Sequence, residues 1–197
     1  GLRLPNAMDG VPGLTQAPVK PGESFDYRFA LPDAGTFWYH PHAHSVEQIG
    51  RGLAGVLVVD EPQGARPDVE ADEVLVLDDW RMASDAVIRP DFGAWHDMSH
   101  AGRLGNYVTV NGRPEFRASA ARGARLRLRL VNAATARVFT LRFRGLRAWI
   151  AALDAMPLEA PVDAEEVVIA PAQRVDLLVD VLAEPGEEAL IASVERN

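Results

Sequence analysis

Hydrophobic and polar residues alternate over short stretches along most of the chain, which is the pattern of strands that bury one face. In the first third, Phe25, Tyr27 and Phe29 fall on one side of an extended backbone. The strands expected there cover residues 23–31, 35–39 and 53–60. A polar loop with glycines, or a short helical turn, is expected over residues 45–52.

A second group of strands follows a linker over residues 61–67 that contains proline and glycine. Asn111 and Gly112 come directly after one of these strands and are the strongest short signal for a hairpin turn. The expected strands cover residues 73–78, 108–110, 125–130, 140–143, 166–169 and 175–181. Short strands at even spacing predict an all-β chain folded as Greek-key β-sandwiches.

Arginine and leucine alternate strictly over residues 125–130. The arginines of this strand have two interpretations, an anion-binding face or the solvated outer face of a sandwich. Antiparallel sheets commonly expose one polar face, so we expect the leucines to point inward and the arginines to point into solvent.

The composition excludes several kinds of site. The chain has no cysteine, which rules out disulfides, zinc–thiolate sites and a blue-copper centre within it, because blue copper needs a cysteine thiolate beside two histidines. A net charge of -8 argues against a nucleic-acid partner, which would require a basic surface. No run of apolar residues is long enough for a membrane-spanning helix.

Three of the five histidines lie in the pentapeptide His40-Pro41-His42-Ala43-His44. On an extended backbone His40 and His42 project to the same face, about 6.6 Å apart along the strand, and can each give one nitrogen to neighbouring metal ions. Pro41 removes a backbone donor and places the segment at a strand end. Imidazole suits copper, zinc and iron alike, so we expect a metal site rather than a histidine-rich surface turn.

Several motifs lie around these histidines. In chain order they are residues 9–29, then Gly-Thr-Phe-Trp-Tyr-His-Pro-His at 35–42, then 48–59 and finally 170–180. Together they strongly resemble the multicopper oxidases, a family that includes laccases, ascorbate oxidases and bacterial copper-efflux oxidases. The resemblance implies two cupredoxin-like units. Residues 1–62 would be the C-terminal part of domain 1, and residues 63–197 would be a complete domain 2 without its own copper.

The same resemblance implies the chemistry. In the family, four His-x-His pairs hold a trinuclear cluster of type 2 and type 3 copper, and a type 1 copper lies in the third domain. His40 and His42 match the second pair, each expected to bind one type 3 copper. The chain is then expected to be an internal fragment, inactive alone, that lacks the first His-x-His motif and the third domain.

The parent protein is expected to be a periplasmic or secreted oxidase. It would couple one-electron oxidation of phenolic, amine or cuprous substrates to the four-electron reduction of O2 to water. A second hypothesis is a non-catalytic copper-binding cupredoxin module. A mononuclear zinc hydrolase is a weaker third, because the chain shows no nucleophile elbow and no aspartate at the required spacing from the histidines.

Asp9 is the candidate catalytic residue, because it resembles the acidic residue that the copper-efflux branch carries near its cluster. Reduction of O2 to water consumes protons, and a carboxylate linked through water can deliver them. The alternative is a turn aspartate, since Asp9-Gly10 is a common turn dipeptide. The two interpretations are weighted equally.

The remaining candidates have a weaker case. We expect His44 to be exposed or to orient a ligand rather than to bind metal. His96 and His100 could chelate a metal if their segment were helical, but a long loop is the preferred interpretation. We expect Trp38 and Tyr39 to pack in the core rather than to conduct electrons.

Overall fold

The computed structural model describes residues 1–194, and most of its regular structure is β-strand. The elements in chain order are η1 (Asn6–Met8), β1 (Gly35–Tyr39), α1 (Ser45–Gly50), β2 (Gly55–Val59), β3 (Ala71–Trp80), α2 (Trp95–Ser99), β4 (Tyr107–Val110), β5 (Arg125–Asn132), β6 (Phe139–Arg144), β7 (Leu146–Leu153), β8 (Met156–Ala164), β9 (Glu166–Ile169), β10 (Arg174–Val181) and β11 (Leu190–Ser193). The all-β prediction is confirmed. The helix of residues 45–50 confirms the short helical turn expected in that segment.

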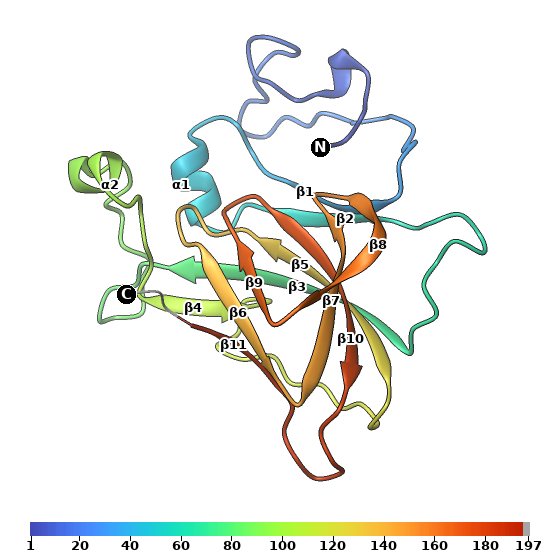
Figure 1. Ribbon diagram of the computed structural model, residues 1–197. Helices are drawn as coiled ribbons and strands as arrows, with labels where there is room; N and C mark the ends of the chain where they lie inside the picture. Colours follow the sequence, from blue (N-terminus) through green and yellow to red (C-terminus); the bar gives the residue numbers. More distant parts are fainter. Residues whose placement is uncertain (195–197) are drawn as a thin grey trace.

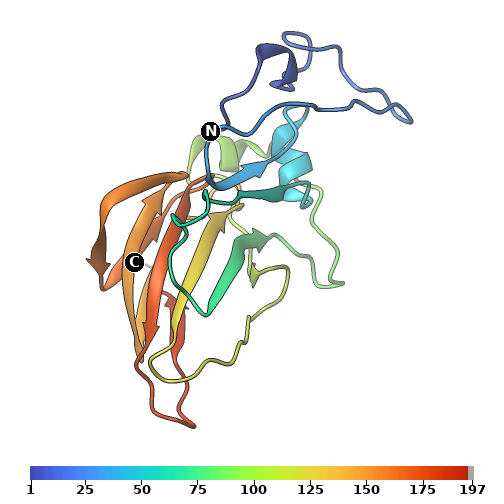
Figure 2. The ribbon, with the colours of Figure 1, turned by 90° about the vertical axis from the view of Figure 1, so that its right-hand side faces the viewer.

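Two sheets pack against each other to form a sandwich, seen from two sides in Figures 1 and 2. One has six strands in the order β4-β3-β5-β10-β7-β8, and the other has three in the order β11-β6-β9. Within the larger sheet, β3 and β5 run parallel, whereas the other neighbours run antiparallel. Inward-facing apolar residues of both sheets form one core, which includes Leu75, Leu77, Leu128, Leu130, Phe139, Leu141, Val167, Ile169, Val175, Leu177 and Val179.

A separate two-stranded sheet, formed by β1 and β2, lies across one end of the sandwich, with the irregular first thirty-odd residues beyond it (Figures 1 and 2). The two strands are antiparallel, with Gly35 opposite Val59 and Tyr39 opposite Gly55. The division of the chain at residue 62 into two domains stays a prediction. Within residues 1–194, no helix is long and apolar enough to cross a membrane.

The expected orientation of the arginines in β5 is wrong for two of the three. Arg127 is 5% exposed and Arg129 only 1% exposed, because β1 and the segment after β2 cover this face of the sheet. Arg125 is exposed, as expected, and pairs with Asp180 on the neighbouring strand. The arginine face is therefore an internal polar contact between the small sheet and the sandwich, not a solvated surface.

The strand expected over residues 23–31 is also wrong. None of the strand pairings of residues 1–194 includes this segment, and a strand needs a hydrogen-bonded neighbour. The alternation still places Phe25 and Tyr27 together, with ring centroids 4.7 Å apart, but both rings are exposed. Tyr27 donates a hydrogen bond of 3.0 Å to Gln16 instead of lying in a core.

The turn expected at Asn111 and Gly112 is confirmed. Both residues have positive φ, 52° and 73°, as the favoured two-residue hairpin turn requires. Val110 and Arg113 exchange backbone hydrogen bonds of 2.7 and 3.0 Å across it. The Asn111 side chain also binds the edge of β3 by accepting from the Val76 amide, which fixes the turn against the sheet.

Candidate metal centre

The strand that leads to the histidines is anchored to the sandwich by its first residues. Gly35 has φ 143°, and a Cβ there would approach the Ala155 Cβ to 2.7 Å, so only glycine fits this close crossing. The buried Thr36 hydroxyl donates to Asp176 Oδ1 at 2.7 Å and accepts from Arg129 Nη1 at 3.0 Å. These contacts set the position from which β1 continues toward residue 40.

Two arginines and three carboxylates form a buried network beneath β1. Arg127 donates to Asp176 and to Glu61, both at 2.6 Å, while Arg129 binds Asp72 in a bidentate pair at 2.6 and 2.9 Å. Burial alone would raise the pKa of Glu61 and of Asp72, but the hydrogen bonds and charges of these arginines outweigh it and both pKa values are lowered. We refer to Thr36 and these five charged residues as the junction network.

The side chains of Trp38, His40 and His42 stack along one side of the chain at the end of β1. The Trp38 and His40 ring centroids are 4.3 Å apart, and those of His40 and His42 are 4.9 Å apart with only 19° between the ring planes. The expectation that the two imidazoles share a face is therefore confirmed, and they are near-parallel. Ions in two-metal sites lie about 3.5–4 Å apart, somewhat less than the 4.9 Å between these ring centroids.

The hydrogen bonds of these rings leave nitrogen atoms available to a metal. His40 Nδ1 lies 3.2 Å from the carbonyl oxygen of Pro41, and a carbonyl can only accept. Nδ1 of a neutral His40 is therefore the protonated nitrogen, and Nε2 keeps its lone pair. His42 is exposed, and its ring has no hydrogen-bond partner among residues 1–194. The donor set thus fits copper, which binds neutral imidazole well.

Two histidines are not a complete site. Among residues 1–194, no group of three or more His, Cys, Asp or Glu side chains is placed to hold a metal ion. An ion at His40 and His42 has only these two side chains as ligands, so water or groups outside this part of the chain complete its coordination.

His44 lies beside the pair without joining the stack. It has a left-handed backbone, with φ 47° and ψ 42°, and immediately precedes α1. It is exposed and shares with His42 a shallow hollow of about 360 Å³, lined also by Ser45, Val46, Glu47, Phe92 and Gly93. The exposure agrees with what we expected of His44, and its relation to a metal stays a prediction.

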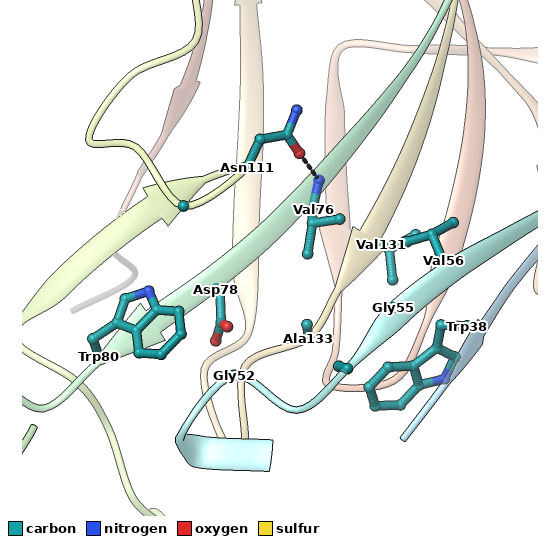
Figure 3. A pocket seen from close by; sticks show the side chains of 12 residues that line it. Trp38, Gly52, Gly55, Val56, Val76, Asp78, Trp80, Asn111, Val131 and Ala133 are labelled. Carbon is teal, nitrogen blue, oxygen red and sulfur yellow. Dashed lines mark hydrogen bonds between the residues drawn. The ribbon is translucent and has the colours of Figure 1, made fainter. Parts of the chain in front are cut away.

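Trp38 also borders a cavity of about 230 Å³ between the β1–β2 sheet and the sandwich (Figure 3). Trp38 and Trp80 close its two sides, and Asp78 lies between them. The other lining residues are Gly52, Ala54, Gly55, Val56, Val76, Asn111, Gly112, Val131 and Ala133. Trp38 thus lines this cavity and also contacts the His40 ring. Tyr39, which we expected in the core, is 63% exposed.

Asp78 was not a candidate in the sequence. Burial raises its pKa to about 6, and the neighbouring Asp79 carboxylate adds to the shift, although the Asp79 amide opposes it by donating to Asp78 Oδ1 at 2.8 Å. The only sequence feature that marks Asp78 is an Asp-Asp pair after the hydrophobic run of β3. The cavity itself needs Trp38, forty positions away, and no local pattern reveals it.

Asp9 closes the turn after η1. Its amide donates to the Asn6 carbonyl at 3.1 Å, and Gly10 follows with φ 80°. The carboxylate is exposed and makes no hydrogen bond to another side chain in residues 1–194. This geometry agrees with the turn interpretation, and a role in proton delivery stays a prediction.

His96 and His100 lie in the connection between β3 and β4. Most of this connection is irregular, as expected, but residues 95–99 form the short helix α2. His100 follows the helix with a non-helical backbone, and its imidazole lies beside that of His96, with ring centroids 4.4 Å apart.

Comparison with known proteins identifies the family. A model described as multicopper oxidase matches residues 1–64, and a second with the same description matches residues 71–196. Together with the two-sheet fold and the paired histidines, these matches show the class: the chain belongs to the multicopper oxidase family.

Individual relatives agree with this assignment. Laccase-1 of Botryotinia fuckeliana is 33% identical over 196 residues, which cover 94% of this chain and 33% of the laccase. The multicopper oxidase MmcO of Mycobacterium tuberculosis is 29% identical and covers 99% of this chain and 43% of that protein. The chain thus spans 33% of the length of the laccase and 43% of the length of MmcO.

Solved structures show the same fold. The crystal structure of a multicopper oxidase from Pseudomonas thermotolerans superposes with a TM-score of 0.88 at 39% identity, covering 96% of this chain and 46% of that one. A multicopper oxidase from Pseudomonas parafulva gives the same TM-score at 36% identity, covering 97% of this chain and 46% of that one.

Proposed function

We propose that this chain supplies two ligands, His40 and His42, to a copper cluster in an enzyme that oxidises small reductants and reduces O2 to water. The observation that carries the proposal is the pair of stacked, near-parallel imidazoles at the end of an anchored strand. Family membership supports copper as the metal and O2 as the electron acceptor. Phenols, amines or cuprous ion are the proposed reductants.

In this proposal the roles of the chain's own residues follow from their contacts. His40 binds through Nε2, because Nδ1–H donates to the Pro41 carbonyl and fixes the ring orientation. His42 offers its ring from the same side at a spacing suited to an adjacent ion. Copper held there supplies the redox chemistry, by taking up electrons that O2 finally receives.

The other parts of the proposal concern groups outside this chain, the role of Asp9 and the cellular location. A blue-copper site needs a cysteine thiolate, and the sequence has no cysteine, so the type 1 copper that oxidises the substrate has to be held elsewhere. The remaining cluster ligands likewise come from beyond these residues. Asp9 is proposed to relay protons to the cluster through water, and the enzyme is proposed to work in the periplasm or outside the cell.

A copper titration of the 197-residue chain, followed by electron paramagnetic resonance, tests the ligand assignment. We expect the His40→Ala/His42→Ala variant to lose one bound Cu²⁺ per chain, because the paired nitrogens are gone. His44→Ala is the matched control from the same pentapeptide and should retain that ion. Unchanged stoichiometry and affinity in the double variant contradict the assignment.

Oxygen uptake distinguishes an oxidase from a copper-binding module without turnover. With this chain placed within a complete multicopper oxidase, the wild type should consume O2 with a phenolic or amine substrate. The double variant should lose uptake while it keeps the copper bound outside the cluster. A wild-type protein that is loaded with copper but consumes no O2 supports the module instead.

A further inference from the structure

The short helix α2 carries His96, and His100 follows directly after its last residue. His96 and His100 are four residues apart, and their rings stack with centroids 4.4 Å apart and 24° between the planes. Both side chains are exposed. His100 has a non-helical backbone, with φ -131° and ψ -125°, yet its ring lies beside that of His96. Two histidines four residues apart are a recurring way to hold a transition-metal ion.

The hydrogen bonds around His100 define which of its nitrogens is free. The Ser99 hydroxyl donates to the Trp95 carbonyl at 2.8 Å, so its oxygen accepts from His100 Nδ1, which lies 2.9 Å away. His100 Nδ1 is also 3.3 Å from the His96 carbonyl, which can only accept. Nδ1 of a neutral His100 therefore carries the proton, and Nε2 keeps the lone pair that binds a metal.

The helix that carries the pair is fixed on its other side. Asp97, between the two histidines, accepts a bidentate pair from Arg81 at 2.8 and 2.8 Å. Arg81 also donates to the Leu104 carbonyl at 3.0 Å, so it ties α2 to the chain before β4. Asp97 is thereby committed to an ion pair, and the histidines remain available to solvent.

We propose that His96 and His100 form a surface site for a late divalent transition-metal ion, Cu²⁺ above all, separate from His40 and His42. A metal–imidazole bond is about 2.0–2.1 Å long, so two nitrogens up to about 4 Å apart can share one ion. The ring centroids are 4.4 Å apart, and both side chains are exposed, so the rings can rotate to aim two nitrogens at one ion. Copper forms the tightest complexes among the divalent ions of its row.

The site uses two side chains, and water completes the coordination. No third His, Cys, Asp or Glu joins them in a cluster within residues 1–194, so the bound ion stays open to solvent and exchangeable. Because both imidazoles are exposed, water hydrates them when no ion is bound. The proposal does not depend on the family's own copper cluster, because it involves a different segment of the chain and different histidines.

The test is a Cu²⁺ titration of the whole chain, read by bound copper and by tryptophan fluorescence. Trp95 precedes His96 and is 78% exposed, so copper at this site should quench its emission. His96→Ala and His100→Ala should each weaken this binding about 100-fold, since each removes one arm of a two-point attachment. In Trp95→Phe the part of the quenching that comes from Trp95 should disappear while the bound copper stays, and quenching of Trp38, which contacts His40, should remain.

Each of the two copper proposals can be refuted without affecting the other. His40→Ala/His42→Ala should leave the quenching of Trp95 and the affinity of the His96–His100 site unchanged, although quenching of Trp38 beside His40 is lost. His96→Ala/His100→Ala should leave the His40–His42 site unchanged. The proposal for α2 is overturned if the His96→Ala/His100→Ala variant binds as much Cu²⁺ as the wild type, with the same affinity and quenching. It is equally overturned if His40→Ala/His42→Ala alone removes all copper binding.

Discussion

The β1–β2 sheet and the sandwich of β3–β11 are held together by different forces. The sandwich encloses an apolar core in which Ile169, Leu177 and Val179 are fully buried. The small sheet has two strands, every residue of β2 is only half-buried, and Tyr39 projects into solvent. An isolated two-stranded sheet is at best marginally stable in water, so the small sheet depends on what it packs against.

The proposed copper ligands directly follow β1, in the region that is less stable by itself. Their position comes from the sandwich, through Thr36, Asp176 and Arg129 beneath β1. The apolar core therefore stabilises the fold, whereas the junction network orients the candidate site. Substitutions of single residues in the two regions test whether these two roles are separate.

The largest effect is expected from Asp176→Asn. This change removes the carboxylate that Arg127 and the Thr36 hydroxyl both contact, and it leaves buried guanidinium charge undercompensated. Removing one partner of a buried ion pair costs about 3–5 kcal/mol, and we expect about 3 kcal/mol because Glu61 remains. Urea unfolding followed by circular dichroism measures the loss.

Asp180→Asn is the matched control on the same strand. Asp180 accepts a bidentate pair from Arg125, at 2.6 and 2.8 Å, but half of the Arg125 side chain is exposed. Exposed pairs contribute up to about 1 kcal/mol, so this variant should unfold close to the wild type. Equal losses in the two variants contradict a special role for the junction network.

A smaller effect is expected from Thr36→Val, which keeps the shape of the side chain and removes its hydroxyl. Asp176 and Arg129 then each lose one buried hydrogen bond, at a cost of about 2 kcal/mol. Because β1 loses its polar anchor, copper affinity at His40 and His42 should also fall. Thermal unfolding and copper titration together measure both changes.

Thr36→Ser retains the hydroxyl and should restore most of the stability and the affinity. Binding at His96 and His100 should be the same in both variants, since α2 is held by the Arg81–Asp97 pair and not by Thr36. A Thr36→Val chain as stable as the wild type shows that the hydroxyl does not hold the strand.

Strands with strong local patterns could be predicted from the sequence. The strand expected over residues 35–39 has the observed bounds, and the leucines of β5 point into the core. The shared side of His40 and His42 was predictable for the same reason, since residues two apart on an extended chain face one way. These features depend only on neighbours in sequence.

Features that depend on distant partners could not be predicted. Arg129 is buried because Asp72 and Asp176, 57 and 47 residues away, neutralise it. The segment with Phe25 and Tyr27 has strand-like alternation but no neighbour to pair with. The short helix α2, which joins His96 to His100, lacks the hydrophobic periodicity that would reveal a longer one.

The smallest effect, and one of opposite sign, is expected at Asp78 in the cavity between the two regions. Its pKa is raised from 3.8 to about 6, so the folded chain keeps a proton that the unfolded chain has already lost. The free energy that the protonated Asp78 contributes to stability is therefore fully present below about pH 4, and it is lost as the pH rises through about 6. Above pH 7 the folded protein carries an unfavourably buried charge.

Asp78→Asn removes that charge and can still accept the hydrogen bond from the Asp79 amide. We expect the variant to be more stable than the wild type by about 1–2 kcal/mol at pH 8, below the full value of the shift because the side chain is only partly buried. The advantage should vanish near pH 4, where the wild-type carboxyl is protonated. Urea unfolding at both pH values measures it. A gain of equal size at pH 4 and pH 8 means that shape or packing, rather than the buried charge, limits the stability of this junction.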